Sequence, residues 1–253
     1  MNPAGWPTIY GGFHPRRVGP RARSGRTERV TSDAETPKYT MITTVIFDLD
    51  GLLADTESLH IESYRRVFAS HGRVLDELEY ADHWIRNGRG IADYITLKKL
   101  TWDIDTIRRQ KTACYHHLVE TTVRPMPGAL ALLDRLDGHK KLAVASSSYR
   151  RDVYCVLDAL KLTERFEVIA AKEDAARLKP APDVFLFVAE RLGVEPAECL
   201  VLEDAEKGVR AARAAGMACI AVPDRFTRDN DFSLATGVVS SLDDITPELL
   251  ESL

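Results

Sequence analysis

Four short clusters of polar residues carry most of the side chains in this sequence that could do chemistry. They are Asp48-Leu49-Asp50-Gly51, Ser146-Ser147-Ser148, Lys179-Pro180-Ala181-Pro182-Asp183 and Glu203-Asp204. Taken alone, each fits a common structural element. The first could be a tight turn, the serines and Asp204 could cap helices, and the prolines could begin one. Whether these clusters are structural or functional depends on where the fold places them.

Short β-rich runs precede these clusters along the chain. The runs are Thr43–Phe47, Leu142–Ala145, Glu167–Ala170, Leu200–Leu202 and Ala218–Val222, with a weaker one at Val238–Val239. Helical patterns near 128–137, 150–160, 182–192 and 205–215 separate them. Strands that alternate with helices at this spacing predict an α/β fold with a Rossmann-like parallel sheet covered on both faces.

All four clusters fall at the carboxyl ends of predicted strands, where parallel α/β sheets bind their ligands. Four carboxylates would meet there, those of Asp48, Asp50, Glu203 and Asp204. At an effective dielectric constant of ~20, two like charges ~5 Å apart repel by roughly 3 kcal/mol. The group therefore requires a cation, and an all-oxygen set completed by water favours Mg²⁺.

Lys179 and the hydroxyl of Ser146 would supply donors for an anion beside the metal ion. A divalent ion, an ammonium, hydroxyl donors and a spare carboxylate nucleophile indicate phosphoryl transfer, in which catalysis is mostly positioning and neutralisation of charge. A calcium loop fits less well, because Leu52 and Leu59 stand where such a loop needs acids. Zinc chemistry is not expected, since the sequence has no HExxH and no CxxC.

One interval interrupts the alternation of strands and helices. Residues 57–122 contain helical patterns at roughly 57–70, 74–86, 90–101 and 104–121, and no convincing strand. We therefore expect a helical second domain, a cap at residues 56–123, inserted into a core formed by residues 41–55 and 124–253.

The composition is typical of a soluble globular protein. Hydrophobic residues make up 45% and charged residues 28% of the 253 residues, and no apolar run approaches the ~20 residues of a membrane span. The net charge is -4, and the body of the chain is more acidic than that because residues 1–40 are basic, which argues against a nucleic-acid or membrane partner. The four cysteines fit free thiols in a reducing cytoplasm. We expect a cytoplasmic monomer or weak homodimer.

Residues 1–40 differ from the rest in composition and pattern. They hold five of the 15 glycines and five of the 12 prolines, and their apolar residues follow neither a period of 2 nor of 3.6. We interpret them as an N-terminal tail, either disordered or a leader upstream of a start at Met41.

The motifs together resemble the haloacid dehalogenase superfamily, and within it the β-phosphoglucomutase-like phosphatases with a helical cap. The resemblance spans about residues 42–245. It rests on the run from Phe47 to Glu57, on Ala145-Ser146-Ser147-Ser148, on Lys179-Pro180-Ala181-Pro182-Asp183, and on Glu203-Asp204-Ala205-Glu206-Lys207-Gly208-Val209 with Ala214-Ala215-Gly216-Met217.

This resemblance implies a role for each acidic residue of the set. Asp48 would be the nucleophile, and Asp50 would protonate the leaving oxygen and later deprotonate the attacking water. Mg²⁺ would be held by the Asp48 carboxylate, the main-chain carbonyl of Asp50 and Asp204, with Glu203 as a direct or water-bridged ligand. The second acid, Asp50, argues against dehalogenation, because the metal-independent dehalogenases of the superfamily lack it.

The remaining residues would bind the substrate. The resemblance implies that Ser146 binds the phosphoryl group beside Ser147, and that Lys179 neutralises charge and steers Asp48. In the cap, Arg86, Asn87 and Arg89 would meet an anionic or hydroxylated substrate, although an exposed turn fits them equally. Phosphonate hydrolysis through a cap lysine is less favoured, with Lys98 and Lys99 as its candidates.

We therefore predict a Mg²⁺-dependent phosphatase acting on a small phosphorylated metabolite, with sugar phosphates as candidates. A phosphosugar mutase is the alternative, because His60 stands where mutase relatives also carry a histidine. A catalytically silent metabolite-binding module is a third interpretation, and the filled catalytic positions speak against it.

Overall fold

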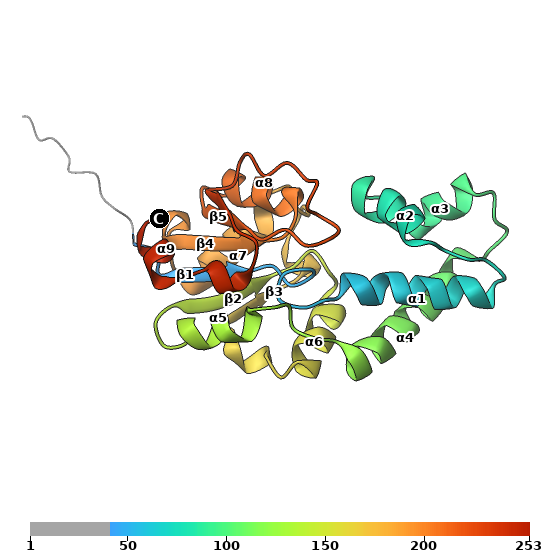
Figure 1. The fold of residues 1–253 in the computed structure, drawn as a ribbon, viewed down its shortest axis with the longest axis horizontal. Helices are drawn as coiled ribbons and strands as arrows, with labels where there is room; N and C mark the ends of the chain where they lie inside the picture. Colours follow the sequence, from blue (N-terminus) through green and yellow to red (C-terminus); the bar gives the residue numbers. More distant parts are fainter. Residues whose placement is uncertain (1–40) are drawn as a thin grey trace, which may run out of the picture. The chain divides into compact units, whose positions relative to one another are not determined.

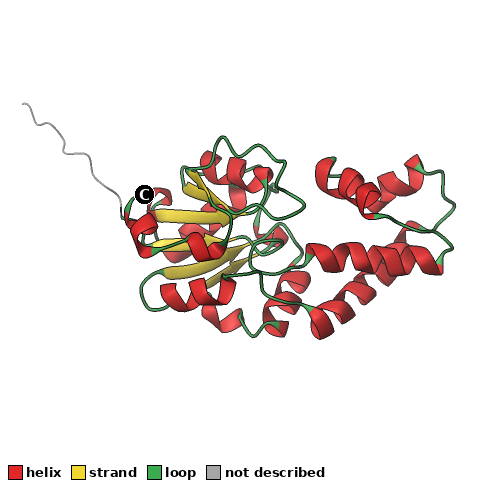
Figure 2. Ribbon diagram, in the orientation of Figure 1, coloured by secondary structure: helices red, strands yellow, loops and turns green. Residues whose placement is uncertain are grey.

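The computed structural model describes residues 41–253, and the predicted tail at residues 1–40 lies outside the described residues. The described part contains a six-stranded sheet in the order β3-β2-β1-β4-β5-β6, in which every neighbouring pair is parallel (Figures 1 and 2). The strands are β1 (Thr44–Phe47), β2 (Lys141–Ala145), β3 (Val168–Ala170), β4 (Cys199–Glu203), β5 (Ala218–Ala221) and β6 (Gly237–Val238). The predicted fold class is confirmed, and β6 begins one residue earlier than expected.

The side chains of each central strand alternate between two hydrophobic clusters, one on each face of the sheet. Val45 and Phe47 of β1 belong to the first cluster and Ile46 to the second. The first also contains apolar residues of α5 (Ala129–Leu136), α6 (Arg150–Ala159) and α9 (Pro247–Glu251). The second contains those of α7 (Asp183–Leu192) and α8 (Glu206–Ala214). Helices therefore cover both faces, as the sequence predicts.

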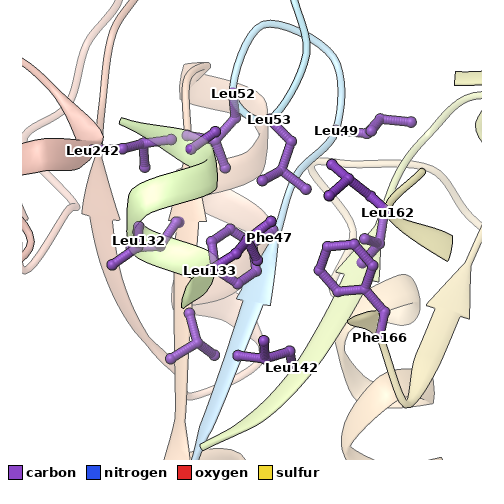
Figure 3. Close-up of a cluster of buried hydrophobic side chains, with 14 of the residues drawn as sticks. Phe47, Leu49, Leu52, Leu53, Leu132, Leu133, Leu142, Leu162, Phe166 and Leu242 are labelled. Atoms are coloured by element: carbon purple, nitrogen blue, oxygen red, sulfur yellow. The ribbon is translucent and has the colours of Figure 1, made fainter. Parts of the chain in front are cut away.

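The two faces are packed with side chains of different size. The first cluster is rich in large residues, among them Phe47, Leu132 and Leu133 (Figure 3). There the ring of Phe166 contacts that of Phe47 edge-on at a centroid distance of 6.0 Å. The second cluster has alanines at many strand positions, including Ala143 and Ala145. Small side chains let a helix pack close to the sheet, which brings α7 and α8 near the strand ends that carry the acids.

A group of helices is inserted between β1 and α5. It consists of α1 (Glu57–Ser70), α2 (Glu77–Tyr80), a π-helical segment (Ala81–Arg86), α3 (Ile91–Leu97) and α4 (Ile104–Thr122). These helices share a hydrophobic cluster of their own, in which the ring of Trp84 stacks between Tyr80 and Tyr94 at centroid distances of 5.1 and 5.0 Å. Helices lie at each of the four predicted helical patterns, and the domain boundaries at 56 and 123 stay a prediction.

The chain enters and leaves this insertion through two segments that are hydrogen bonded to each other. The Asp55 N–H donates to the Arg124 carbonyl at 3.0 Å, and the Met126 N–H donates to the Leu53 carbonyl at 2.9 Å. Between them, Ala54 and Pro125 form an antiparallel bridge. The insertion is thus joined to the sheet by a short two-stranded ribbon.

Some short elements were not predicted from the sequence. Helix α9 is one of them, although Thr246 caps it by accepting a hydrogen bond from the Leu249 N–H and Pro247 begins it, a combination typical of a helix start. None of the helices in residues 41–253 is long and apolar enough to cross a membrane.

Packing beneath the sheet predicts different effects for two leucines of α5. Leu133 is fully buried, whereas Leu130 on the same helix is 45% exposed. Leu133→Ala should lower the free energy of unfolding by about 2–5 kcal/mol because it leaves a cavity in the core. Leu130→Ala should change it by about 0.5 kcal/mol or less. Urea denaturation of both variants checks this, and equal losses would contradict the assignment of Leu133 to the core.

Candidate active site

Residues from several strand ends meet in one pocket at the carboxyl edge of the sheet. Asp48 and Asp50 follow β1, the serines follow β2, and Glu203 ends β4 with Asp204 beyond it. The pocket has a volume of about 670 Å³. Its wall includes Asp48, Asp50, Ser147, Glu203 and Asp204 from the sheet side, and His60, Trp84 and Arg86 from the inserted helices. All four predicted carboxylates therefore line one pocket.

Lys179 lies beneath the pocket and binds three adjacent strands. Its Nζ donates to Asp48 Oδ1 at 2.6 Å, to Glu203 Oε1 at 2.6 Å and to the Ala145 carbonyl at 2.9 Å. These partners stand at the ends of β1, β4 and β2, and all three ammonium hydrogens are used. Burial acts to lower the pKa of Lys179, but the charges of Asp48 and Glu203 outweigh burial and raise it. The lysine is therefore charged.

Asp48 and Asp204 are buried carboxylates whose negative charges are not fully compensated by neighbouring groups. Burial raises the pKa of Asp48 to about 7, although Lys179 acts to lower it. Burial, followed by the charges of Glu203 and Asp48, raises the pKa of Asp204 well above its ordinary value. Asp204 is only 7% exposed, and neither of its oxygens accepts a hydrogen bond from residues 41–253. A nearby cation would relieve both residues.

Carboxylate oxygens of Asp48, Glu203 and Asp204 lie within 4.8 Å of one another. An all-oxygen set of this kind, with room for water in the pocket, fits a hard divalent cation such as Mg²⁺. The cluster contains no histidine or cysteine, so a softer metal ion would lack its preferred ligands. The residues present thus fit the metal ion expected from the sequence.

Glu203 is held from two sides. Its Oε1 accepts from Lys179, and its Oε2 accepts from the Ala205 N–H at 3.1 Å. Gly208 on α8 makes room for this carboxylate, because a Cβ at that position would lie 1.7 Å from Oε1. Gly208 belongs to one of the sequence motifs, and this close approach explains why no side chain is tolerated there.

Hydroxyl groups fix Asp50 in its ionised form. Its Oδ1 accepts from the Thr56 hydroxyl at 2.7 Å, and its Oδ2 accepts from the hydroxyls of Ser148 at 2.6 Å and Ser146 at 3.2 Å. Burial acts to raise the pKa of Asp50, but other causes, these three hydrogen bonds among them, outweigh burial and lower it. The sequence analysis missed Thr56 and Ser148 as partners of this acid.

The predicted phosphate-binding serines have different surroundings. The Ser146 hydroxyl donates to Asp50 and accepts from the Ser148 N–H at 2.9 Å. The Ser147 hydroxyl is buried at the pocket wall and has no hydrogen-bond partner among the described residues. Ser147 is therefore the serine whose hydroxyl is available to a ligand.

His60 reaches the pocket from α1, as expected. Its ring stacks on Tyr115 at a centroid distance of 4.1 Å, and its Nδ1 lies 2.5 Å from Lys111 Nζ. Burial, with a further contribution from Lys111, lowers the pKa of His60 to about 3, and burial lowers the pKa of Lys111 to about 8. The ring is neutral and accepts from the lysine. Lys111 was missed because it stands on α4, far from His60 in the sequence.

The cap residues predicted to bind substrate are only partly placed at the pocket. Arg86 lines it, while pairing with Asp82 at 3.1 Å. Asn87 and Arg89 are exposed and are not among the pocket residues, and the Asn87 side chain donates to the Asp82 carbonyl at 2.6 Å. Both residues follow the π-helical segment, which ends at Arg86.

The lysines considered for phosphonate chemistry also lie outside the pocket wall. Lys98 forms an ion pair with Glu79 at 2.6 Å. Lys99 is exposed and has a positive φ of 52°. Neither is placed to form a Schiff base with a substrate held beside Asp48.

Comparison with known proteins agrees with the fold and with the resemblance found in the sequence. The sequence profile of the family described as "Haloacid dehalogenase-like hydrolase" matches residues 45–222. Protein CbbY of Rhodobacter capsulatus is 33% identical over 76% of this chain and 89% of its own length. Fructose-1-phosphate phosphatase YqaB of Escherichia coli is 33% identical over 70% of this chain and 95% of its own length. The crystal structure of CbbY from Rhodobacter sphaeroides in complex with phosphate has a TM-score of 0.75 at 31% identity, covering 84% of this chain and all of that one.

The hydroxyl contacts of Asp50 predict a pH-dependent loss of stability in Ser148→Ala. A lowered carboxyl pKa stabilises the folded state above the ordinary value of 3.8, and this stabilisation is lost as the pH falls through the lowered pKa. At pH 7 the variant should lose about 1.5–3 kcal/mol, the usual contribution of a hydrogen bond to a charged group. The loss should shrink steadily as the pH is lowered below about 4.

Urea denaturation at several pH values between 3 and 8 measures this difference. Ser147→Ala is the matched control, because the Ser147 hydroxyl has no partner among the described residues. A pH-independent loss in Ser148→Ala would show that its hydroxyl does not stabilise an ionised Asp50.

Proposed function

Because the chain belongs to the haloacid dehalogenase-like hydrolase family and is a phosphatase of that family, we propose that it hydrolyses a small phosphorylated sugar through an aspartyl-phosphate on Asp48. One observation carries this proposal. Lys179 holds Asp48 by one carboxylate oxygen, while Asp50, only two residues away, is held ready for proton transfer.

The nucleophile of this reaction is Asp48 Oδ2. Lys179 occupies Oδ1, and Oδ2 accepts no hydrogen bond from residues 41–253. An oxygen without a donor keeps its full electron density for attack on phosphorus, while the lysine fixes the direction of the carboxylate. Attack forms the bond from Oδ2 to phosphorus, breaks the bond from phosphorus to the ester oxygen, and leaves the phosphoryl group on Asp48.

Asp50 moves the protons of both steps. It gives its proton to the departing ester oxygen and takes one from the water that then attacks the aspartyl-phosphate. The three hydroxyl bonds stabilise its ionised form, so it becomes an acid only when it exchanges them for the substrate oxygen. Once its proton has passed to the leaving oxygen, the same bonds stabilise the resulting carboxylate, which then accepts a proton from the attacking water.

Mg²⁺ at this site would neutralise the charge that gathers on the phosphoryl oxygens and on Asp48. The residues that would hold it are Asp48, Asp204 and the main-chain carbonyl of Asp50, with Glu203 as a direct or water-bridged ligand. Glu203 also keeps Lys179 in place. The unpaired Asp204 and the raised pKa values of Asp48 and Asp204 support a cation here.

A sugar phosphate is supported as substrate by the relatives and by the polar pocket wall. One relative is described as a fructose-1-phosphate phosphatase and another, from Thermotoga maritima, as a phosphorylated carbohydrates phosphatase. Glu57, Arg86 and Asn230 line the pocket beyond the acids and can bind hydroxyl or anionic groups. We further propose that residues 56–123 act as a cap that excludes water around the reacting atoms.

A phosphosugar mutase is the second candidate. The placement of His60 in the pocket wall favours it, and the neighbouring folds include a structure described as a putative β-phosphoglucomutase from Thermotoga maritima, with a TM-score of 0.70 at 28% identity. A mutase must keep water from its phospho-enzyme until a sugar hydroxyl attacks. The exposed turn with Asn87 and Arg89 offers no dedicated set of sugar contacts, which favours hydrolysis.

Loss of the nucleophile or of the metal ion should abolish activity without unfolding the protein. Asp48→Asn, or chelation by EDTA, should reduce hydrolysis of a generic phosphate ester by at least about 10³-fold. The amide cannot form the acyl phosphate, and removal of the metal ion leaves Asp204 and the phosphoryl oxygens without a neutralising charge. The far-UV circular dichroism should not change. Asp134→Asn, at an exposed acid of the core, is the control, and retained activity after either treatment would refute the mechanism.

Water, not a sugar hydroxyl, should accept the phosphoryl group. With a hexose 1-phosphate and a trace of hexose 1,6-bisphosphate, each turnover should release one inorganic phosphate, and no hexose 6-phosphate should accumulate. A coupled phosphate assay and chromatography of the sugars measure the two rates. Isomerisation faster than phosphate release would show that the protein is a mutase. For either function, a panel of phosphorylated sugars would identify the substrate.

A further inference from the structure

Asp224 is an acidic residue of the pocket wall that the catalytic set does not include. It stands in the loop after β5 and lines the same cavity as Asp48 and Asp204. It forms no ion pair within residues 41–253. An acid without a countercharge beside three other acids needs an explanation.

The segment Asp224–Thr227 fixes the direction of this carboxylate. The Oδ1 atom of Asp224 accepts from the Phe226 N–H at 2.7 Å, from the Thr227 N–H at 2.9 Å and from the Thr227 hydroxyl at 3.0 Å. The Thr227 hydroxyl in turn accepts from the Asp224 N–H at 3.0 Å. Oδ1 is therefore fully engaged, and rotation of the carboxylate would break three hydrogen bonds.

The other oxygen, Oδ2, accepts no hydrogen bond from the described residues and faces the acidic cluster. A Cβ built on Gly51 would lie 3.7 Å from Asp224 Oδ2 and 2.6 Å from Asp204 Oδ2. Both free oxygens thus border the same small space beside Gly51. Gly51, with its positive φ of 82° and no side chain, leaves that space open.

Glu203 differs from these two acids, because protein donors occupy both of its oxygens. Asp204, which is 7% exposed and has no partner in residues 41–253, is the buried carboxylate aimed into the site. We propose that Asp224 is a positioning residue for the divalent cation, adding a negative charge and a free acceptor oxygen beside Asp204 and so raising the affinity of the site for Mg²⁺. This inference rests on the proposed function, which requires that cation.

A purely structural role for Asp224 predicts a different effect of the substitution Asp224→Asn on the site. The turn uses Oδ1 alone, and asparagine supplies the same acceptor oxygen in the same place. If Asp224 served only the turn, Asp224→Asn would leave every property of the site unchanged. If it serves the cation, the same substitution removes one charge and turns the free acceptor into an N–H donor that faces Asp204.

The experiment measures Mg²⁺ binding to the full chain by isothermal titration calorimetry, in the absence of substrate. Asp224→Asn should raise the dissociation constant about tenfold, and Thr227→Val, which removes only the hydroxyl bonds to Asp224, should raise it by a smaller factor. Asp229→Asn is the matched control, because Asp229 is an exposed acid of the same pocket wall. It should change the dissociation constant by less than twofold.

Melting temperatures in EDTA separate affinity from stability. Without metal, Asp224→Asn should melt at the same temperature as the unaltered protein or higher, because repulsion with Asp204 is relieved, and it should gain less from added Mg²⁺. Equal dissociation constants for Asp224→Asn and Asp229→Asn would overturn the role of Asp224 while leaving the proposed function intact. Failure of the unaltered protein to bind Mg²⁺ would overturn both.

Discussion

A single buried ammonium organises the carboxyl edge of the sheet. Lys179 donates to the ends of three strands that are neighbours in the order β2-β1-β4, and it can do so only because parallel pairing brings those ends to the same level. Its removal would leave Asp48 and Glu203 as unpaired buried charges, a loss that typically costs 3–5 kcal/mol. The hydrogen bonds of Lys179 that stabilise the carboxyl edge of the sheet also orient the carboxylate of Asp48. The stability of the fold and the position of this acid therefore depend on the same bonds.

The remaining acids are controlled by three different means. Glu203 is held by donors on both oxygens, and Gly208 leaves it the necessary room. Asp50 is held by hydroxyls that stabilise its ionised form. Asp204 has no hydrogen-bond partner in the described chain, and burial and the neighbouring acids raise its pKa. Carboxylates of identical chemistry thus differ in their electrostatic state because their donors differ, and the roles proposed for them follow these differences.

The sequence of this protein predicts well the features that depend on local residue patterns, which are the strands and the positions of their carboxyl ends. Runs such as Leu142–Ala145 are apolar enough to identify strands, and the carboxyl ends of parallel strands necessarily meet, so the convergence of Asp48 with Glu203 follows without a structure. Contacts between distant elements do not follow. The pairing of His60 with Lys111 depends on how α1 packs against α4. Which residues of the turn after the π-helical segment line the pocket depends in the same way on how the inserted helices pack. The turn at Asp224 was readable from its spacing to Thr227, but only the fold reveals what its second oxygen faces.

The two-stranded ribbon at Ala54 and Pro125 limits how the inserted helices can move. Sliding one strand of such a ribbon along the other breaks its hydrogen bonds, whereas bending the ribbon out of its plane keeps them. The ribbon therefore resists sliding of the inserted helices relative to the sheet more than it resists their rotation. Ala54 also forms a parallel bridge with Asp50, so the ribbon lies next to an acid of the pocket. Any rotation of the insertion about this ribbon would change the distance between Asp50 and the pocket side chains that the insertion carries, His60 and Arg86.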